Sequence, residues 1–129
     1  MKKILLLLIA LSLLGCATSS DRQFSLTQTL LAYEKAIRWG DFENLLRFRE
    51  NTTESDLALL DTYENIRISG YQVKRHRPSE DEFKHNIDVE ISYFKTHDNR
   101  IGSVSDKQNW QYSKENNRWY ISSPLPQFK

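Results

Sequence analysis

The chain has 129 residues, and its 18 lysines and arginines nearly balance its 17 aspartates and glutamates, so the formal net charge is +1. This length has room for one domain, and the near-neutral charge offers no basic field that would attract nucleic acid. The single cysteine excludes a disulfide within the chain.

The first fifteen residues have the composition of a secretory signal peptide. Lys2 and Lys3 supply a positively charged start, and residues 4–14 are apolar apart from one serine. Eleven such residues are too few to span a bilayer, which takes about 20, but they suit the core of a signal. We expect residues 1–15 to be cleaved off, which leaves 16 basic and 17 acidic residues and a net charge of −1.

The end of this segment resembles a bacterial lipobox, formed here by Leu13, Leu14, Gly15 and Cys16. In lipoproteins the thiol takes a diacylglyceryl group, and cleavage makes the cysteine the first mature residue. Two or more acyl chains hold a protein stably on a membrane. The resemblance implies lipidation at Cys16 and a place in the bacterial cell envelope. Because Ala17 and not aspartate follows, resemblance to sorting in enteric bacteria implies the outer membrane, facing the periplasm; a Gram-positive source implies the single cell membrane.

The lipidated N-terminus and a short polar linker are expected over residues 16–23, ahead of a domain over residues 24–128. The ten steps from Cys16 to Leu26 reach about 35 Å at most when extended. We therefore expect the domain to lie close to the membrane surface.

Three helices are predicted at the start of the domain. The first has a capping box of Ser25 and Gln28 and ends at Gly40. Asp41 is expected to cap a shorter second helix, and Thr53 or Ser55 a third. Apolar residues fall at helical spacing on one side of each helix. They are Leu26, Leu30, Tyr33 and Ile37 in the first, where Leu31 and Ala36 widen the stripe, then Phe42, Leu45, Leu46 and Phe48 in the second, and Leu57, Leu60 and Tyr63 in the third.

After Asn65 the apolar residues alternate, which is typical of β-strands. The phase of the alternation changes at Gly70 and predicts a β-bulge or a bend. Folding the polar turn 113–117 symmetrically places Tyr112 opposite Trp119, and Trp110 opposite Ile121. Helices followed by strands predict an α+β fold, with three N-terminal helices packed on a curved antiparallel sheet of about four strands.

Two stretches resemble nuclear transport factor 2-like (cystatin-like cone) domains. AYEKAIRWGDFENLL, residues 32–46, is similar to their long first helix, Gly-Asp turn and short second helix. WQYSKENNRWYISSPLPQF, residues 110–128, is similar to their final hairpin. The resemblance covers most of residues 22–128 and, with the lipobox, makes the chain similar to small bacterial lipoproteins of this fold.

This fold often encloses a cavity between sheet and helices, and relatives such as ketosteroid isomerase place a carboxylate or histidine inside it. Residues an even number of positions apart in a strand point to the same face of the sheet. The candidates are therefore Asp106, on the same face as Trp110, and His85, on the same face as Ile87. We expect Asp106 to face solvent near a strand start and His85 to lie near a strand end. The possible pocket residues are Tyr33, Asp106, Trp110, Tyr112 and Trp119.

The sequence therefore favours a lipid-anchored, non-enzymatic envelope protein that binds a protein partner or sits in an envelope assembly. Two alternatives stay open: a cone that binds a small hydrophobic ligand, and a cyclase- or isomerase-like enzyme. We expect no cofactor, no phosphate loop, and no metal site, because His76, His85 and His97 lack metal-ligand spacing. The basic run 74–77 is expected to be a solvated hairpin tip, neutralised by the acidic residues in 79–82.

Overall fold

The computed structural model describes residues 2–129, with side chains from residue 19 onward. The side chains of the lipobox residues Leu13, Leu14, Gly15 and Cys16 thus lie outside the described part. The elements are α1 (Lys2–Trp39), the 3₁₀ helix η1 (Glu43–Phe48), α2 (Glu54–Thr62), β1 (Ile66–Pro78), β2 (Lys84–Lys95), β3 (Ile101–Ser113) and β4 (Arg118–Ile121). The strands form one antiparallel sheet in the order β1-β2-β3-β4, which confirms the α+β prediction.

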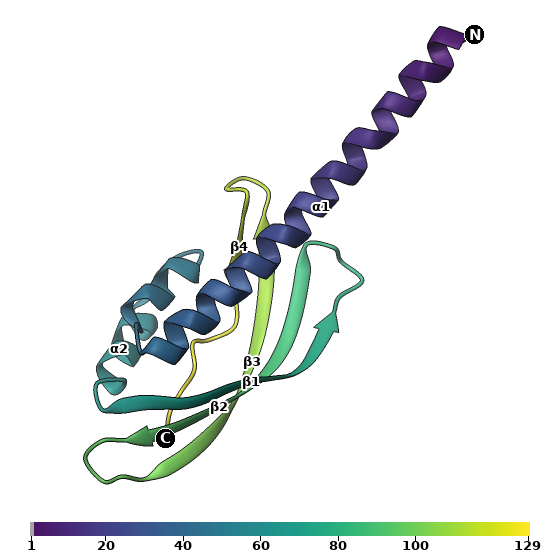
Figure 1. The fold of residues 1–129 in the computed structure, drawn as a ribbon. Helices are drawn as coiled ribbons and strands as arrows, with labels where there is room; N and C mark the ends of the chain where they lie inside the picture. The colour runs from purple at the N-terminus through teal and green to yellow at the C-terminus, as the bar shows by residue number, and fades with distance from the viewer. Residues whose placement is uncertain (1) are drawn as a thin grey trace.

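Helix α1 crosses one face of the curved sheet, and its N-terminal part extends beyond it (Figure 1). The predicted helix start at Ser25 is wrong, because α1 runs unbroken through the expected linker. No glycine or proline interrupts residues 16–39, and the Thr29 hydroxyl donates to the Ser25 carbonyl at 2.8 Å inside the helix. Ten helical residues rise about 15 Å, less than half of the extended estimate.

The two short helices follow the turn at Gly40, where φ is +70° and α1 ends as predicted. Asp41 does not cap η1 with its side chain; its carbonyl accepts the Asn44 N–H at 3.2 Å. Of the two caps predicted for the third helix, Thr53 is the one that forms. Its hydroxyl accepts the Asp56 N–H and its own N–H donates to the Asp56 carboxylate at 2.9 Å, which makes a capping box.

The bulge predicted at Gly70 is confirmed by a register shift between Ile68 and Gly70. A second shift, between Val73 and Arg75, was not predicted. After it, Arg75 and Arg77 share one face of β1, and each pairs with a different oxygen of Asp88 at 2.8 Å. Hydrogen bonds from these two guanidinium groups lower the pKa of Asp88. Strand β2, rather than the segment 79–82, therefore neutralises the two arginines of the basic run.

The core fills the space between α1 and the inner face of the sheet. The β3–β4 hairpin has the predicted pairs, Tyr112 with Trp119 and Trp110 with Ile121. The segment after β4 closes one end of the core, because Leu125 and Phe128 are buried there. The largest side chains exposed by less than 2% include Trp110, Tyr33, Ile37, Leu45, Ile87, Ile91, Ile121 and Leu125.

Candidate functional site

A row of buried polar side chains lies on the inner face of β3. Asp106, Gln108 and Trp110 alternate along the strand and are exposed by 5%, 0% and 0%. The Trp110 indole N–H donates to Gln108 Oε1 at 3.1 Å. Gln108 Nε2 donates to Asp106 Oδ2 at 2.8 Å and to the Tyr71 hydroxyl at 2.9 Å. Gln108 therefore uses both of its amide hydrogens and its oxygen inside the core.

Tyr33 is the residue of α1 that packs against this row of side chains. Its ring packs edge-on against Trp110, with centroids 5.2 Å apart, and against Phe48 at 5.3 Å. Its fully buried hydroxyl has no hydrogen-bond partner among the residues that the structure describes. The structure thus brings together three of the five predicted pocket residues: Tyr33, Asp106 and Trp110.

Burial is the largest cause of the pKa shifts in this cluster. It raises the pKa of Asp106 to about 6, while the hydrogen bond from Gln108 acts in the opposite direction. It also raises the pKa of Tyr33, and the nearby charge of Asp106 adds to that rise. The expectation that Asp106 faces solvent is wrong, because it shares the parity of Trp110 on the face that packs against α1.

A carboxyl group with a pKa near 6 suits proton transfer at neutral pH, but a general base must also reach its substrate. Tyr33 and Gln108 are completely buried and Asp106 nearly so. Five open clefts lie on the described surface. Tyr33, Asp106 and Gln108 line none of them. The cluster is therefore a packed polar network under α1 that none of these five clefts reaches.

The other two predicted pocket residues belong to a separate contact cluster. Tyr112 and Trp119 pack with ring centroids 5.4 Å apart, and the Trp119 indole N–H donates to the Arg22 carbonyl at 3.1 Å. The Arg22 guanidinium lies 4.4 Å from the Phe83 ring centroid and pairs with Glu82 at 2.9 Å. This cluster ties α1 to the β1–β2 turn and to the β3–β4 hairpin. No local pattern marked Arg22, which lies in the expected linker, as a core residue.

His85 does not join Asp106. It is half-buried near the start of β2, opposite Trp110 in the register. Its Nε2 lies 3.2 Å from Nδ1 of His76 on β1. Burial and the neighbouring His76 lower the pKa of His85. Spacing along the chain did not predict this pair, because the β1–β2 register brings the two rings together.

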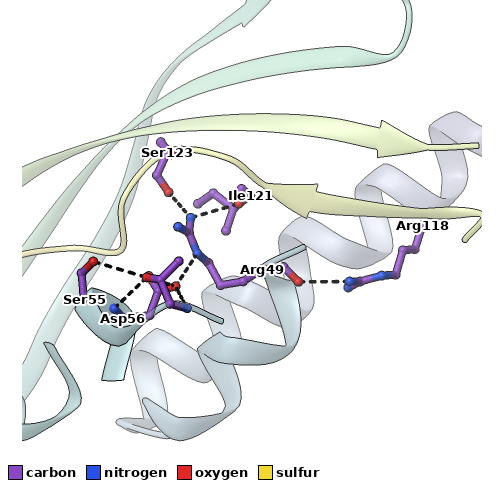
Figure 2. A network of polar contacts seen from close by, with 7 residues as sticks. Arg49, Ser55, Asp56, Arg118, Ile121 and Ser123 are labelled. Carbon is purple, nitrogen blue, oxygen red and sulfur yellow. Dashed lines mark hydrogen bonds and ion pairs between the residues drawn. The ribbon is translucent and has the colours of Figure 1, made fainter. Parts of the chain in front are cut away.

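A second polar network surrounds Arg49 (Figure 2). Its Nε donates to Asp56 at 3.2 Å, and its Nη1 donates to the carbonyls of Ile121 at 3.1 Å and Ser123 at 2.6 Å. Burial raises the pKa of Asp56, but hydrogen bonds from Thr53 and the charge of Arg49 outweigh it, so the pKa is lowered. One guanidinium thus joins η1, α2 and the chain after β4, a structural role that the sequence did not indicate.

An open cleft of about 710 Å³ lies between the turn after α1 and helix α2. Leu57 lines it with 51% of its surface exposed, and Trp39, exposed by 80%, precedes its first lining residue. Leu57, expected on the same side of the third helix as Leu60 and Tyr63, is thus half exposed to solvent. The cleft combines apolar and acidic side chains: Phe42, Leu57, Leu60 and Tyr63, with Asp41, Glu43, Asp61 and Glu64.

The chain matches no family model, and comparisons with curated proteins and with solved structures give no match. Across the described residues, none of the helices combines the length and the apolar character needed to cross a bilayer.

Proposed function

We propose that this chain is a lipid-anchored, non-enzymatic protein of the bacterial cell envelope that binds a protein partner. Its anchor is the lipid on Cys16, and alanine at position 17 supports a place on the outer membrane, facing the periplasm. Its domain is a nuclear transport factor 2-like cone, a proposal supported by the order of long helix, short helices and curved antiparallel sheet. The observation that carries the binding role is the cleft lined by exposed Leu57, with exposed Trp39 next in sequence to its first lining residue.

The filled interior favours this function over the alternatives. A small-ligand site or an active site of this fold class needs an open, mostly apolar cavity. Here Tyr33, Gln108 and Trp110 are exposed by 0% and occupy the space between α1 and β3. The chemistry available to a partner therefore lies on the outer surface.

The cleft also specifies the chemistry of the partner. Large exposed apolar side chains next to a hollow are typical of binding surfaces. The four carboxylates around it, on Asp41, Glu43, Asp61 and Glu64, attract positive charge, and Arg67 is the one basic side chain in the lining. A basic segment that inserts an apolar anchor fits this combination.

We expect a photo-crosslinking residue at Leu57, introduced into the full chain in cells of the source organism, to give a discrete protein adduct. The matched control is the same residue at Ile101, which is exposed by 81% at the start of β3 and does not line the cleft. In the presence of Asp61→Lys and Glu64→Lys, we expect the Leu57 adduct to disappear, because the carboxylates then repel a basic partner.

Several results would contradict the binding role. Identical adducts at both positions would mean random collisions, and an adduct that survives the charge reversal would mean that the acidic residues do not select the partner. A complete absence of adducts at Leu57 in intact cells would remove the proposed function.

We expect Cys16→Ser to abolish incorporation of a fatty-acid label and to leave an unprocessed precursor, because a hydroxyl does not replace the thiol in lipid transfer. Labelling, gel mobility and membrane fractionation measure this result, with Ala17→Ser as the control that keeps the thiol. Normal mature protein, still bound to the membrane in Cys16→Ser, would overturn the anchor. If sorting follows the enteric pattern, Ala17→Asp moves the labelled protein to the inner membrane.

A further inference from the structure

His76 and His85 come from opposite strands of the β1–β2 hairpin, and their rings lie on one face of it. Nδ1 of His76 lies 3.2 Å from Nε2 of His85, and the ring centroids are 5.5 Å apart. His76 is exposed and His85 is half-buried, so the pair is accessible from solvent. Two imidazole nitrogens thus converge at the surface of a two-stranded β scaffold.

The separation of these nitrogens matches that of two ligands of one metal ion. With Zn–N bonds of about 2.0–2.1 Å and tetrahedral angles, two nitrogens bound to one zinc lie about 3.3 Å apart. In the metal-free pair, one nitrogen must donate its proton to the other. A divalent ion replaces that shared proton and takes a lone pair from each ring, each ring tilting so that both lone pairs point at the ion.

The surroundings do not oppose a cation at this position. The neighbouring Arg75 and Arg77 both bind Asp88 on the opposite face of the sheet. His76 also lines an open cleft of about 240 Å³ together with the carboxylate-bearing Glu34. Within the described residues, no third His, Cys, Asp or Glu joins the pair, so water supplies the remaining coordination positions.

We propose that Nδ1 of His76 and Nε2 of His85 bind one divalent transition-metal ion of the class that prefers imidazole, with zinc as the representative. The site is independent of the partner cleft and of the lipid anchor. It gives the hairpin a metal-dependent cross-link between β1 and β2, with open positions on the metal for water or a small anion.

The test is a calorimetric titration of the full chain, in detergent, with zinc chloride. We expect one ion per chain, and a loss of affinity of about tenfold or more in both His76→Ala and His85→Ala. The control is His97→Ala, whose ring is exposed and lies 3.7 Å from Asp98, and it should retain wild-type affinity. Circular dichroism checks that each variant is folded, and His85→Gln serves as a milder second variant.

A second readout on the wild-type chain does not depend on any substitution. Nitrogen-15 NMR of the histidine rings should show zinc-dependent shifts at Nδ1 of His76 and Nε2 of His85, and none at His97. Absence of zinc binding, equal binding in either single variant, or ligation through the other nitrogen of either ring would each overturn the proposal.

Discussion

Replacing Arg49 by methionine is expected to lower the free energy of unfolding by about 3–5 kcal/mol, the usual cost of removing one partner of a buried ion pair. The side chains of Arg49 and Asp56 are exposed by only 14% and 4%. The substitution leaves the Asp56 carboxylate buried with Thr53 as its remaining partner, and it removes the donor shared by the carbonyls of Ile121 and Ser123. Domains of this size are stable by only about 5–15 kcal/mol, so the variant should be close to unfolding at 37 °C.

Urea unfolding followed by tryptophan fluorescence measures this loss. Arg47→Met is the matched control, because Arg47 lies two residues before Arg49, is exposed, and its side chain only bonds Asn44 at 3.1 Å; its effect should stay within about 0.5 kcal/mol. A similar small change for Arg49→Met would show that the network in Figure 2 contributes little.

The Arg49–Asp56 pair also makes the free energy of unfolding depend on pH in the acid range. Because the pKa of Asp56 is lowered in the folded chain, its contribution is present at neutral pH and disappears as the pH falls through that lowered pKa. Arg49→Met should therefore differ most from the wild type above pH 4 and least in strong acid.

Asp106→Asn is expected to stabilise the chain at pH 7, by up to about 3 kcal/mol. The pKa of Asp106 rises from 3.8 to about 6 on folding, so the folded state binds more protons than the unfolded state between these two values. Stability therefore falls as the pH rises from about 4 to about 6, where the buried carboxyl becomes charged. Asparagine stays neutral, and its side-chain oxygen can still accept from Gln108.

Urea unfolding of both proteins at pH 4, 5, 6 and 7 tests this expectation. The difference between variant and wild type should grow with pH across that range and then level off. Asp61→Asn, at an exposed position on α2, should produce no such trend. A pH-independent difference, or a variant that is less stable at pH 7, would show that the Asp106 carboxylate is better solvated than its burial indicates.

The strands could be predicted from the sequence because alternation is a local property. The bulge at Gly70 and the pairing of Trp110 with Ile121 follow from the phase of apolar residues and the length of one turn. The start of α1 could not be predicted in the same way. Serine at position 25 is compatible with both a cap and a helix interior, and contacts of Arg22 with Trp119 extend the packed helix beyond it.

The interior cluster was predicted only in part. The even spacing of Asp106 and Trp110 predicted that they share one face of the strand. The spacing did not predict whether a helix covers that part of the face. Tyr33 packs on Trp110 and completes the cover, so a carboxylate that would be solvated on an open strand is buried. Gln108, which links Asp106, Tyr71 and Trp110, was missed because a lone glutamine carries no pattern.

By itself the sequence determined the α+β class, the helix stop at Gly40, a cap at Thr53 or Ser55 and the β3–β4 register, since each depends on residues close together in the chain. Only the tertiary structure decided that Asp106 is buried, that Arg49 joins three segments, and that His76 meets His85. These depend on which distant elements lie against one another. Burial and ionisation are set by that packing, and local spacing carries no information about it.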